Sequence, residues 1–213
     1  ALVKPPIGGH GARGVGFYGQ RLFEALIKFV DVAWVDFLSF PIGKFDIIHY
    51  PYYDFFWPTL APIRSAKTVV TLHDLIPLKF PQHFPLGLRA KFVWPWQKFL
   101  LKGVEAVITD SYCSQQDIKE IIGVNNTYVT YLAADEAFKP LKIERENFVL
   151  YVGGGNWNKN VISLLKACQK IKIPLVLVGK EFLQKPANNI ETESLREVQG
   201  YIDNQMVIAK GFI

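Results

Sequence analysis

A strand-like run leads into a histidine and an aspartate in the stretch Thr68-Val69-Val70-Thr71-Leu72-His73-Asp74. Similar apolar runs, each bounded by Gly, Pro or Asp, alternate along the chain with segments of helical period. This alternation is typical of a parallel sheet whose strands are joined by crossover helices. We therefore expect an α/β protein, with His73 and Asp74 at the carboxyl end of one strand, where open α/β sheets present functional side chains.

The expected strands and helices fall into two groups. In the first group we expect strands at 1–3, 32–35, 47–49, 68–72, 106–109 and 128–131, and helices at 18–29, 88–102 and 114–122. In the second group we expect strands at 148–152, 175–178 and 206–209, and helices at 161–170 and 193–202. The start of the helix at 114–122, from Ser114 to Asp117, resembles a capping box. Residues 133–147 are polar and contain Pro140, so we place one domain at 1–140 and a second, incomplete one at 141–213.

The composition narrows the class of protein. Hydrophobic residues make up 50% of the 213 residues and charged residues 20%, which suits a packed core and argues against disorder. No apolar run approaches the ~18 residues needed to cross a bilayer, and the first residues do not form a signal peptide, so we expect a cytoplasmic protein. Cys113 and Cys168 are isolated and lack metal-ligand spacing. The net charge of +5 suits nucleic acid, anionic lipid or phosphate-bearing ligands and does not choose among them.

A glycine-rich loop follows the first expected strand. Gly9-His10-Gly11-Ala12-Arg13-Gly14 matches the G-x-G-x-x-G dinucleotide fingerprint, but Gly14-Val15-Gly16 follows and helical period begins only near Tyr18. The loop is therefore long for a tight pyrophosphate turn. Its backbone N–H groups and Arg13 still suit an anion, and we favour contact with a ligand over a flexible connection without one.

Polar and aromatic side chains follow other expected strands. His49 ends one strand and Ser111 follows another, so both would lie at the same sheet edge as His73. A buried histidine bonded to the backbone and a helix-capping serine are the alternative interpretations. The loop at 50–58 contains Tyr52 and Tyr53, whose rings would either stack on sugars or pack inward.

A second glycine loop, Gly153-Gly154-Gly155, follows the strand at 148–152 and precedes a helix. Lys159 supplies a cation there, and Asn158 and Asn160 supply amide groups or a helix cap. The glycines allow a phosphate to approach the backbone, so we favour a diphosphate site. A capped turn with a solvated lysine is the alternative.

The segment 91–102 combines cations with aromatic residues. Three lysines share one helical face and three aromatic residues cluster elsewhere, namely Lys91, Lys98 and Lys102, and Phe92, Trp96 and Phe99. We favour a helix whose lysine face is solvated and whose aromatic residues form an ordinary buried stripe. Contact with a membrane surface is the alternative.

Several of these segments occur in a characteristic order: Gly14-Val15-Gly16-Phe17-Tyr18, Asp46-Ile47-Ile48-His49, Thr71-Leu72-His73-Asp74-Leu75-Ile76-Pro77, Ile108-Thr109-Asp110-Ser111, Asn158-Lys159-Asn160 and Gly211-Phe212. In this order and spacing they resemble the retaining family 4 glycosyltransferases of GT-B fold, a group that includes bacterial mannosyl- and glucosyltransferases. The resemblance covers nearly the whole chain. It implies two Rossmann-like parallel-sheet domains, an acceptor-side domain first and a donor-side domain second.

The resemblance also implies an activity. A sugar would pass from a nucleoside diphosphate donor, of the GDP-mannose or UDP-glucose type, to an acceptor hydroxyl with retention of anomeric configuration. It would do so without a metal or other cofactor, in the synthesis of cell-surface polysaccharide or glycolipid. The expected partners are the nucleotide sugar and a sugar or lipid-linked acceptor, with contact to the inner face of the membrane as an option and no nucleic acid.

The resemblance assigns roles to residues of this chain. The catalytic candidates are His73, as an orienter of the transferred sugar, and Asp74. The donor-binding candidates are Gly14, Gly16, Ser111, Gly153, Gly154, Asn158 and Lys159. The acceptor-binding candidates are His49, Tyr52 and Tyr53. The chain departs from the family in having Gly154 and Asn158 where many members have arginine, and the family's paired-glutamate segment would lie beyond Ile213, so we expect a C-terminally truncated transferase.

Two other functions compete with this one. An NAD(P)-dependent oxidoreductase would use the first glycine loop and an acidic residue such as Asp36 after the second strand, but it leaves the second glycine loop unexplained. A non-catalytic subunit of a split transferase would account for an incomplete donor pocket.

Overall fold

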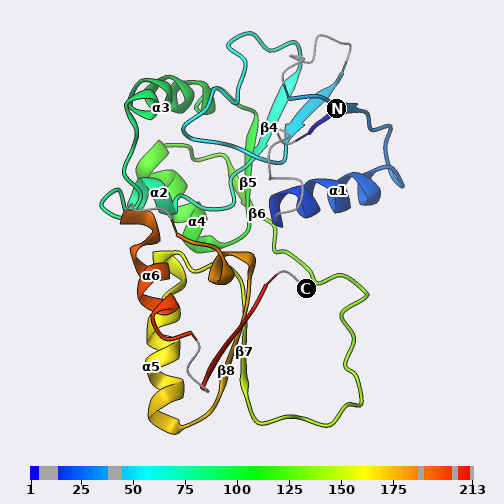
Figure 1. Cartoon of the computed structure of the whole chain (residues 1–213). Helices are drawn as coiled ribbons and strands as arrows, with labels where there is room; N and C mark the ends of the chain where they lie inside the picture. Colours follow the sequence, from blue (N-terminus) through cyan, green and yellow to red (C-terminus); the bar gives the residue numbers. More distant parts are fainter. Residues whose placement is uncertain (5–13, 38–44, 187–189, 203–205, 212–213) are drawn as a thin grey trace. The chain divides into compact units, whose positions relative to one another are not determined.

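The computed structural model describes residues 1–4, 14–37, 45–186, 190–202 and 206–211 (Figure 1). The chain divides into two compact units. The first consists of Ala1–Lys79 and Pro85–Ala134, and the second of Phe80–Phe84 and Asp135–Ile213. Each unit has its own parallel sheet and its own hydrophobic core.

The first unit is built on a sheet that has six strands in the described residues, in the order β2-β1-β3-β4-β5-β6. The strands are β1 (Leu2–Val3), β2 (Trp34–Val35), β3 (Ile47–Tyr50), β4 (Lys67–Thr71), β5 (Ala106–Thr109) and β6 (Thr127–Val129). Every pair of neighbouring strands is parallel. Val70 and Val107 in the central strands are fully buried, because both faces of the sheet are covered.

The order of the strands reverses at β1, which lies between β2 and β3. The helices of this unit are α1 (Gly14–Leu26), α2 (Ile76–Lys79), α3 (Leu88–Leu101) and α4 (Tyr112–Asp117), with a π-helical turn at Ile118–Ile122. Because parallel crossovers are right-handed, the reversal places α1 on one face of the sheet and α3 and α4 on the other (Figure 1). The carboxyl ends of β1 and β3 therefore flank the point at which α/β sheets open a crevice.

Two helices begin at other residues than the sequence predicted. Helix α1 begins at Gly14, so Gly14 and Gly16 form its first turn and do not belong to the preceding loop. Residues 5–13, which hold most of the first glycine loop, lie outside the described residues. Helix α4 begins at Tyr112 and is capped by Ser111, whose Oγ accepts the N–H of Ser114 at 3.1 Å. The predicted capping box at Ser114 is therefore wrong, because Ser114 is already inside the helix.

Helix α3 contradicts the prediction of a buried aromatic stripe. Its buried side chains include Ala90, Gln97 and Leu101, which recur at helical spacing and face the core. Phe92 is 81% exposed and Phe99 is 73% exposed. Each of them lies two residues, or about 200°, beyond a buried position, so they occupy the outward face of the helix.

The second unit carries a parallel sheet with three strands in the described residues, β7 (Val149–Val152), β8 (Leu175–Val178) and β9 (Val207–Lys210), in that order. The connections contain α5 (Val161–Ile171), α6 (Glu193–Gln199) and 3₁₀ turns at Trp157–Lys159, Lys180–Leu183 and Ile190–Thr192. Because the strands are added in one direction, right-handed crossovers place α5 and α6 on the same face of the sheet (Figure 1). Leu165, Leu177 and Val198 are buried between these helices and the sheet.

A glutamine holds a loop to the core of the first unit. Gln97, in the middle of α3, is completely buried. Its Oε1 accepts the backbone N–H groups of Thr59 at 3.0 Å and Leu60 at 2.9 Å. Its Nε2 donates to the Leu60 carbonyl at 3.4 Å. Its hydrogen bonds thus take the place of strand pairing for the buried backbone that follows the loop at 50–58, here called the aromatic loop.

We expect Gln97→Leu to lower the free energy of unfolding by about 2–4 kcal/mol, because two buried N–H groups lose their acceptor. Urea unfolding followed by circular dichroism measures this change. Gln116→Leu is the matched control, since Gln116 is exposed and, within the described part of the chain, its side chain bonds to Glu120 one helical turn away. A loss below 1 kcal/mol for Gln97→Leu would show that the loop does not depend on this residue.

Candidate functional site

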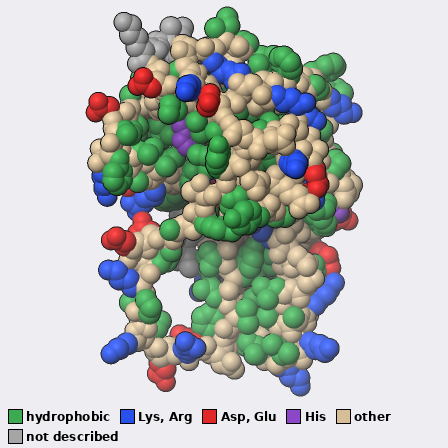
Figure 2. Space-filling view, turned by 180° about the vertical axis from the view of Figure 1, so that it is seen from behind, with side chains coloured by type: hydrophobic (Ala, Val, Ile, Leu, Met, Phe, Trp, Pro, Cys, Tyr) green, Lys and Arg blue, Asp and Glu red, His purple; other side chains and the backbone are tan. Residues whose placement is uncertain are grey.

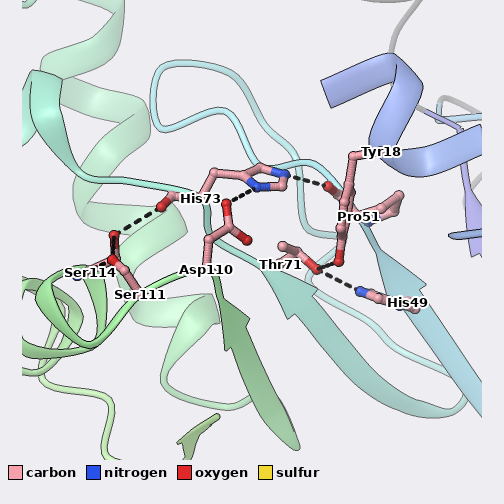
Figure 3. A network of polar contacts seen from close by, with 8 residues as sticks. All are labelled: Tyr18, His49, Pro51, Thr71, His73, Asp110, Ser111 and Ser114. Atoms are coloured by element: carbon pink, nitrogen blue, oxygen red, sulfur yellow. Dashed lines mark hydrogen bonds and ion pairs between the residues drawn. The ribbon is translucent and has the colours of Figure 1, made fainter. Parts of the chain in front are cut away.

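A network of polar side chains lies at the carboxyl ends of β3, β4 and β5 (Figure 3). Parallel pairing aligns these ends, because Tyr50 of β3 pairs with Val70 of β4, and Thr71 of β4 pairs with Ile108 of β5. The network consists of Tyr18, His49, Pro51, Thr71, His73, Asp110, Ser111 and Ser114. It gathers residues that are up to about a hundred positions apart in the sequence at one edge of the sheet.

His73 is held at both ring nitrogens. Its Nδ1 lies 2.8 Å from Oδ2 of Asp110, and its Nε2 lies 3.2 Å from the carbonyl oxygen of Pro51. The ring packs perpendicular to that of Tyr18, with ring centroids 4.8 Å apart. The side chain remains 21% exposed, so it is positioned firmly and still reaches solvent.

His49 lies in a different environment, one strand away. Its Nε2 is 2.8 Å from Oγ1 of Thr71, and the same hydroxyl lies 3.4 Å from the hydroxyl of Tyr18. Burial, with a smaller contribution from the Ala1 ammonium, lowers the pKa of His49 to about 4. The ring is therefore neutral at pH values above about 4. Burial also raises the pKa of the Tyr18 phenol, so this hydroxyl keeps its proton.

Asp74 does not contact the ring of its sequence neighbour His73 in any hydrogen bond or ion pair that the described residues make. It is exposed, and its Oδ1 accepts the backbone N–H of Ile76 at 3.1 Å, at the start of α2. The carboxylate that pairs with His73 is Asp110, which the sequence reasoning missed. Its position in the sequence could have identified it, because Asp110 directly follows the strand at 106–109 and therefore lies at the same sheet edge as His73.

Ser111 has a structural position next to this pair. Its Oγ caps α4 and donates to Oγ of Ser114 at 3.1 Å. Ser114 in turn donates to the backbone carbonyl of His73 at 3.0 Å. The predicted donor-binding serine therefore lies at the site and supports the backbone of His73 through Ser114 (Figure 3).

The aromatic loop after β3 packs mostly inward. Tyr53 and Phe55 are buried, and Phe55 also contacts Trp94 of α3. Burial raises the pKa of Tyr53, and its hydroxyl has no hydrogen-bond partner among the described residues. Tyr52 is half-buried and donates to Asp54 at 3.3 Å. The structure thus places the predicted acceptor residue Tyr53 in the core.

The predicted phosphate loop lies in the second unit. The N–H of Gly155 donates to Oε2 of Glu181 at 3.1 Å, and the hydroxyl of Tyr151 donates to the carbonyl of Gly154 at 2.7 Å. A carboxylate of the protein therefore already occupies one amide of the loop. Gly153 has φ +152°, a backbone conformation that favours glycine.

Asn158 and Lys159 lie in the 3₁₀ turn directly before α5. Lys159 is exposed, and Oδ1 of Asn158 is buried without a hydrogen-bond partner among the described residues. Asn160, in the left-handed conformation with φ 48°, precedes α5 and makes no side-chain cap there. Of the first N–H groups of α5, that of Ser163 donates to the carbonyl of Asn160 at 3.1 Å, and no side chain of the described residues caps the helix start.

The described residues contain no cluster of three or more His, Cys, Asp or Glu side chains arranged to hold a metal ion. Within the same residues, every helix is too short or too polar to cross a bilayer.

A solved structure shares the fold. The chain is similar to TarM of S. aureus, seen in a crystal structure of a mutant in complex with fondaparinux, alpha-GlcNAc-glycerol and UDP, with 12% identity and a TM-score of 0.50. That match covers 78% of this chain and 33% of TarM, so the chain spans about a third of its length. A second TarM crystal structure gives 12% identity, a TM-score of 0.48, and coverage of 78% and 32%. The prediction of an α/β protein of GT-B type, with two Rossmann-like parallel sheets, is confirmed.

Sequence comparison identifies the family. A search of curated proteins found no significant match to the chain. The model of Glycosyltransferase Family 4 matches residues 4–137, a span that contains the whole polar network described above. Because this match covers more than half of the 213 residues, the protein belongs to Glycosyltransferase Family 4.

Proposed function

We propose that the chain forms the acceptor-side domain and the first part of the donor-side domain of a retaining glycosyltransferase. The transferase moves a sugar from a nucleoside diphosphate donor, of the GDP-mannose or UDP-glucose type, to a hydroxyl of a sugar or lipid-linked acceptor. The observation that carries the proposal is the His73 imidazole at the carboxyl end of β4, fixed at both nitrogens within a family 4 domain.

The groups at the start of α5 and at His73 support this function. A departing nucleoside diphosphate develops negative charge, which N–H groups and a cation stabilise when they are fixed in advance. The start of α5, with Lys159 beside it, offers such groups. His73 supplies a hydrogen-bond donor for a sugar hydroxyl, and no metal or other cofactor enters the proposal. The product belongs to cell-surface polysaccharide or glycolipid synthesis.

The exposed face of α3 supports a second proposed property, contact with the anionic inner face of a membrane. Four large apolar side chains follow one another at spacings of three or four residues on this face: Leu88, Phe92, Trp96 and Phe99, each at least 40% exposed. Residues 75–104 contain five Lys or Arg residues and no Asp or Glu. Figure 2 shows hydrophobic and basic side chains together at the upper right, on the side where α3 lies. This combination of an apolar stripe with a one-sign charge suits an anionic lipid surface.

For transfer itself, we expect His73→Gln to lower the rate of the whole transferase by about 10²-fold, the usual cost of losing a fixed donor near developing charge. Product formation from GDP-mannose and UDP-glucose with a polyprenyl-linked acceptor, followed by mass spectrometry, measures the rate. NMR of the new linkage reports retention or inversion. Absence of sugar transfer with both donors, or an inverted linkage, would contradict the proposed reaction.

For the donor site, we expect Lys159→Ala to weaken binding of UDP or GDP to the whole transferase by about 1.5–3 kcal/mol, the usual loss for a hydrogen bond to a charged group. Isothermal titration calorimetry gives the affinity. Lys170→Ala, at the opposite end of α5, removes the same charge away from the loop and should leave the affinity unchanged. Equal affinities in both variants would remove Lys159 from the site. The 213-residue chain alone should bind poorly, since it spans a third of the solved transferase.

For the membrane face, we expect the doubly substituted chain Phe92→Ser/Phe99→Ser to lose most of its binding to vesicles that contain phosphatidylglycerol. Vesicle sedimentation with the 213-residue chain measures this loss. Phe138→Ser is the matched control, because Phe138 is also 81% exposed but lies outside α3. Equal binding to pure phosphatidylcholine vesicles, or binding that the double substitution does not change, would contradict contact of this face with an anionic membrane.

A further inference from the structure

Both nitrogens of His73 face hydrogen-bond acceptors. On one side is Oδ2 of Asp110 at 2.8 Å, and on the other is the carbonyl oxygen of Pro51 at 3.2 Å. A backbone carbonyl only accepts, and so does a carboxylate. A neutral imidazole has one N–H and would leave a lone pair against one of these oxygens. Both contacts are satisfied only when both ring nitrogens carry protons.

The carboxylate of Asp110 has one polar contact among the described residues, and that contact is His73. Its Oδ1 is buried and has no hydrogen-bond partner there. It also caps no helix, since Ser111 caps α4. The Asp110 carboxylate is half-buried and stabilises no turn or helix end among the described residues. Its contact with His73 is therefore what explains its position.

The other polar groups near His73 and Asp110 do not compete for the ring of His73. The ring of Tyr18 packs perpendicular to that of His73, and burial raises the pKa of its phenol, which therefore keeps its proton. Asp74, on the same strand end as His73, turns its carboxylate toward the N–H of Ile76. His49 bonds to Thr71 and is neutral. Among the residues that the structure describes, the charged group that faces His73 from the packed elements is therefore Asp110.

We propose that Asp110 is the positioning residue of His73: it holds the Nδ1–H and thereby presents Nε2–H as a donor that a sugar hydroxyl can take over from the Pro51 carbonyl. This inference rests on the proposed function for the identity of the ligand. The carbonyl of Pro51 holds the donor in place while the site is empty. With both nitrogens protonated, His73 acts as a hydrogen-bond donor and leaves no lone pair to serve as a base.

Ring spectroscopy tests the pair without any transferase assay. The 213-residue chain has four histidines, so long-range ¹H–¹⁵N correlation of histidine-labelled protein gives a spectrum that His73→Gln assigns. We expect the wild-type chain to show protons on both nitrogens of His73, with the Nδ1 proton shifted far downfield, since each nitrogen faces an acceptor oxygen. His49 should show a neutral ring. A His73 ring whose Nδ1 carries no proton would overturn the proposal without any variant.

Asp110→Asn should abolish the downfield Nδ1 proton of His73 and leave the His49 signals unchanged. Asp74→Asn is the matched control, since it removes a charge beside His73 without touching the ring, and it should preserve the downfield signal. Asp110→Glu keeps the carboxylate and should restore the signal at least in part. Retention of the signal in Asp110→Asn, with a dispersed amide spectrum showing a folded chain, would contradict the role of Asp110.

Kinetics of the whole transferase then separate the two proposals. We expect Asp110→Asn to lower kcat by about tenfold or more while KM for the nucleotide sugar changes less than threefold, since the donor diphosphate is held elsewhere. A normal ring spectrum together with no transfer activity would refute the proposed function and leave the positioning of His73 standing. An unchanged kcat in Asp110→Asn would refute the positioning role in transfer.

Discussion

Parallel pairing of β3, β4 and β5 is the constraint on which the candidate site depends. Parallel strands bring their carboxyl ends to one edge, so each strand can deliver one polar residue to the same place. β3 delivers His49, β4 delivers His73, and β5 delivers Asp110. A shift of register by one residue would turn each of these side chains to the other face of the sheet. Burial of Val70 and Val107 opposes such a shift and so keeps the polar side chains at the site.

Buried polar groups tie the loops to this frame. Gln97 satisfies the backbone after the aromatic loop, and the chain of hydroxyls from Ser111 to Ser114 holds the carbonyl of His73. Thr71, which is completely buried, links Tyr18 of α1 with His49 of β3. Each of these groups would be costly to leave unpaired in the interior, so each fixes the position of a neighbour. The rigidity of the site therefore comes from hydrogen bonds between elements that are distant in the sequence.

The glycine loop of the second unit shows a different arrangement. Glu181 occupies the N–H of Gly155, so a carboxylate already lies where an anionic ligand of this loop would be received. A Cβ at Gly154 would come within 2.9 Å of the same carboxylate. A larger residue at this position would therefore displace the end of the Glu181 side chain. In the proposed donor site, the first N–H groups of α5 and Lys159 carry the diphosphate, and Glu181 shapes the loop beside them.

The sequence by itself determined the α/β class, the order of the strands along the chain and the location of His73, His49 and Ser111 at strand ends. These follow from local patterns, because apolar periodicity and glycine or proline breaks report which segments are buried and where they stop. The partners of these residues could not be predicted in the same way. The sequence neighbour Asp74 begins α2, while Asp110 from the next strand pairs with His73. Likewise, Ser111 rather than Ser114 caps α4, and the aromatic side of α3 faces outward. Only the tertiary structure decided these points, since hydrogen-bond partners and buried faces depend on which elements pack together, and that is set by long-range pairing and not by neighbours in the chain.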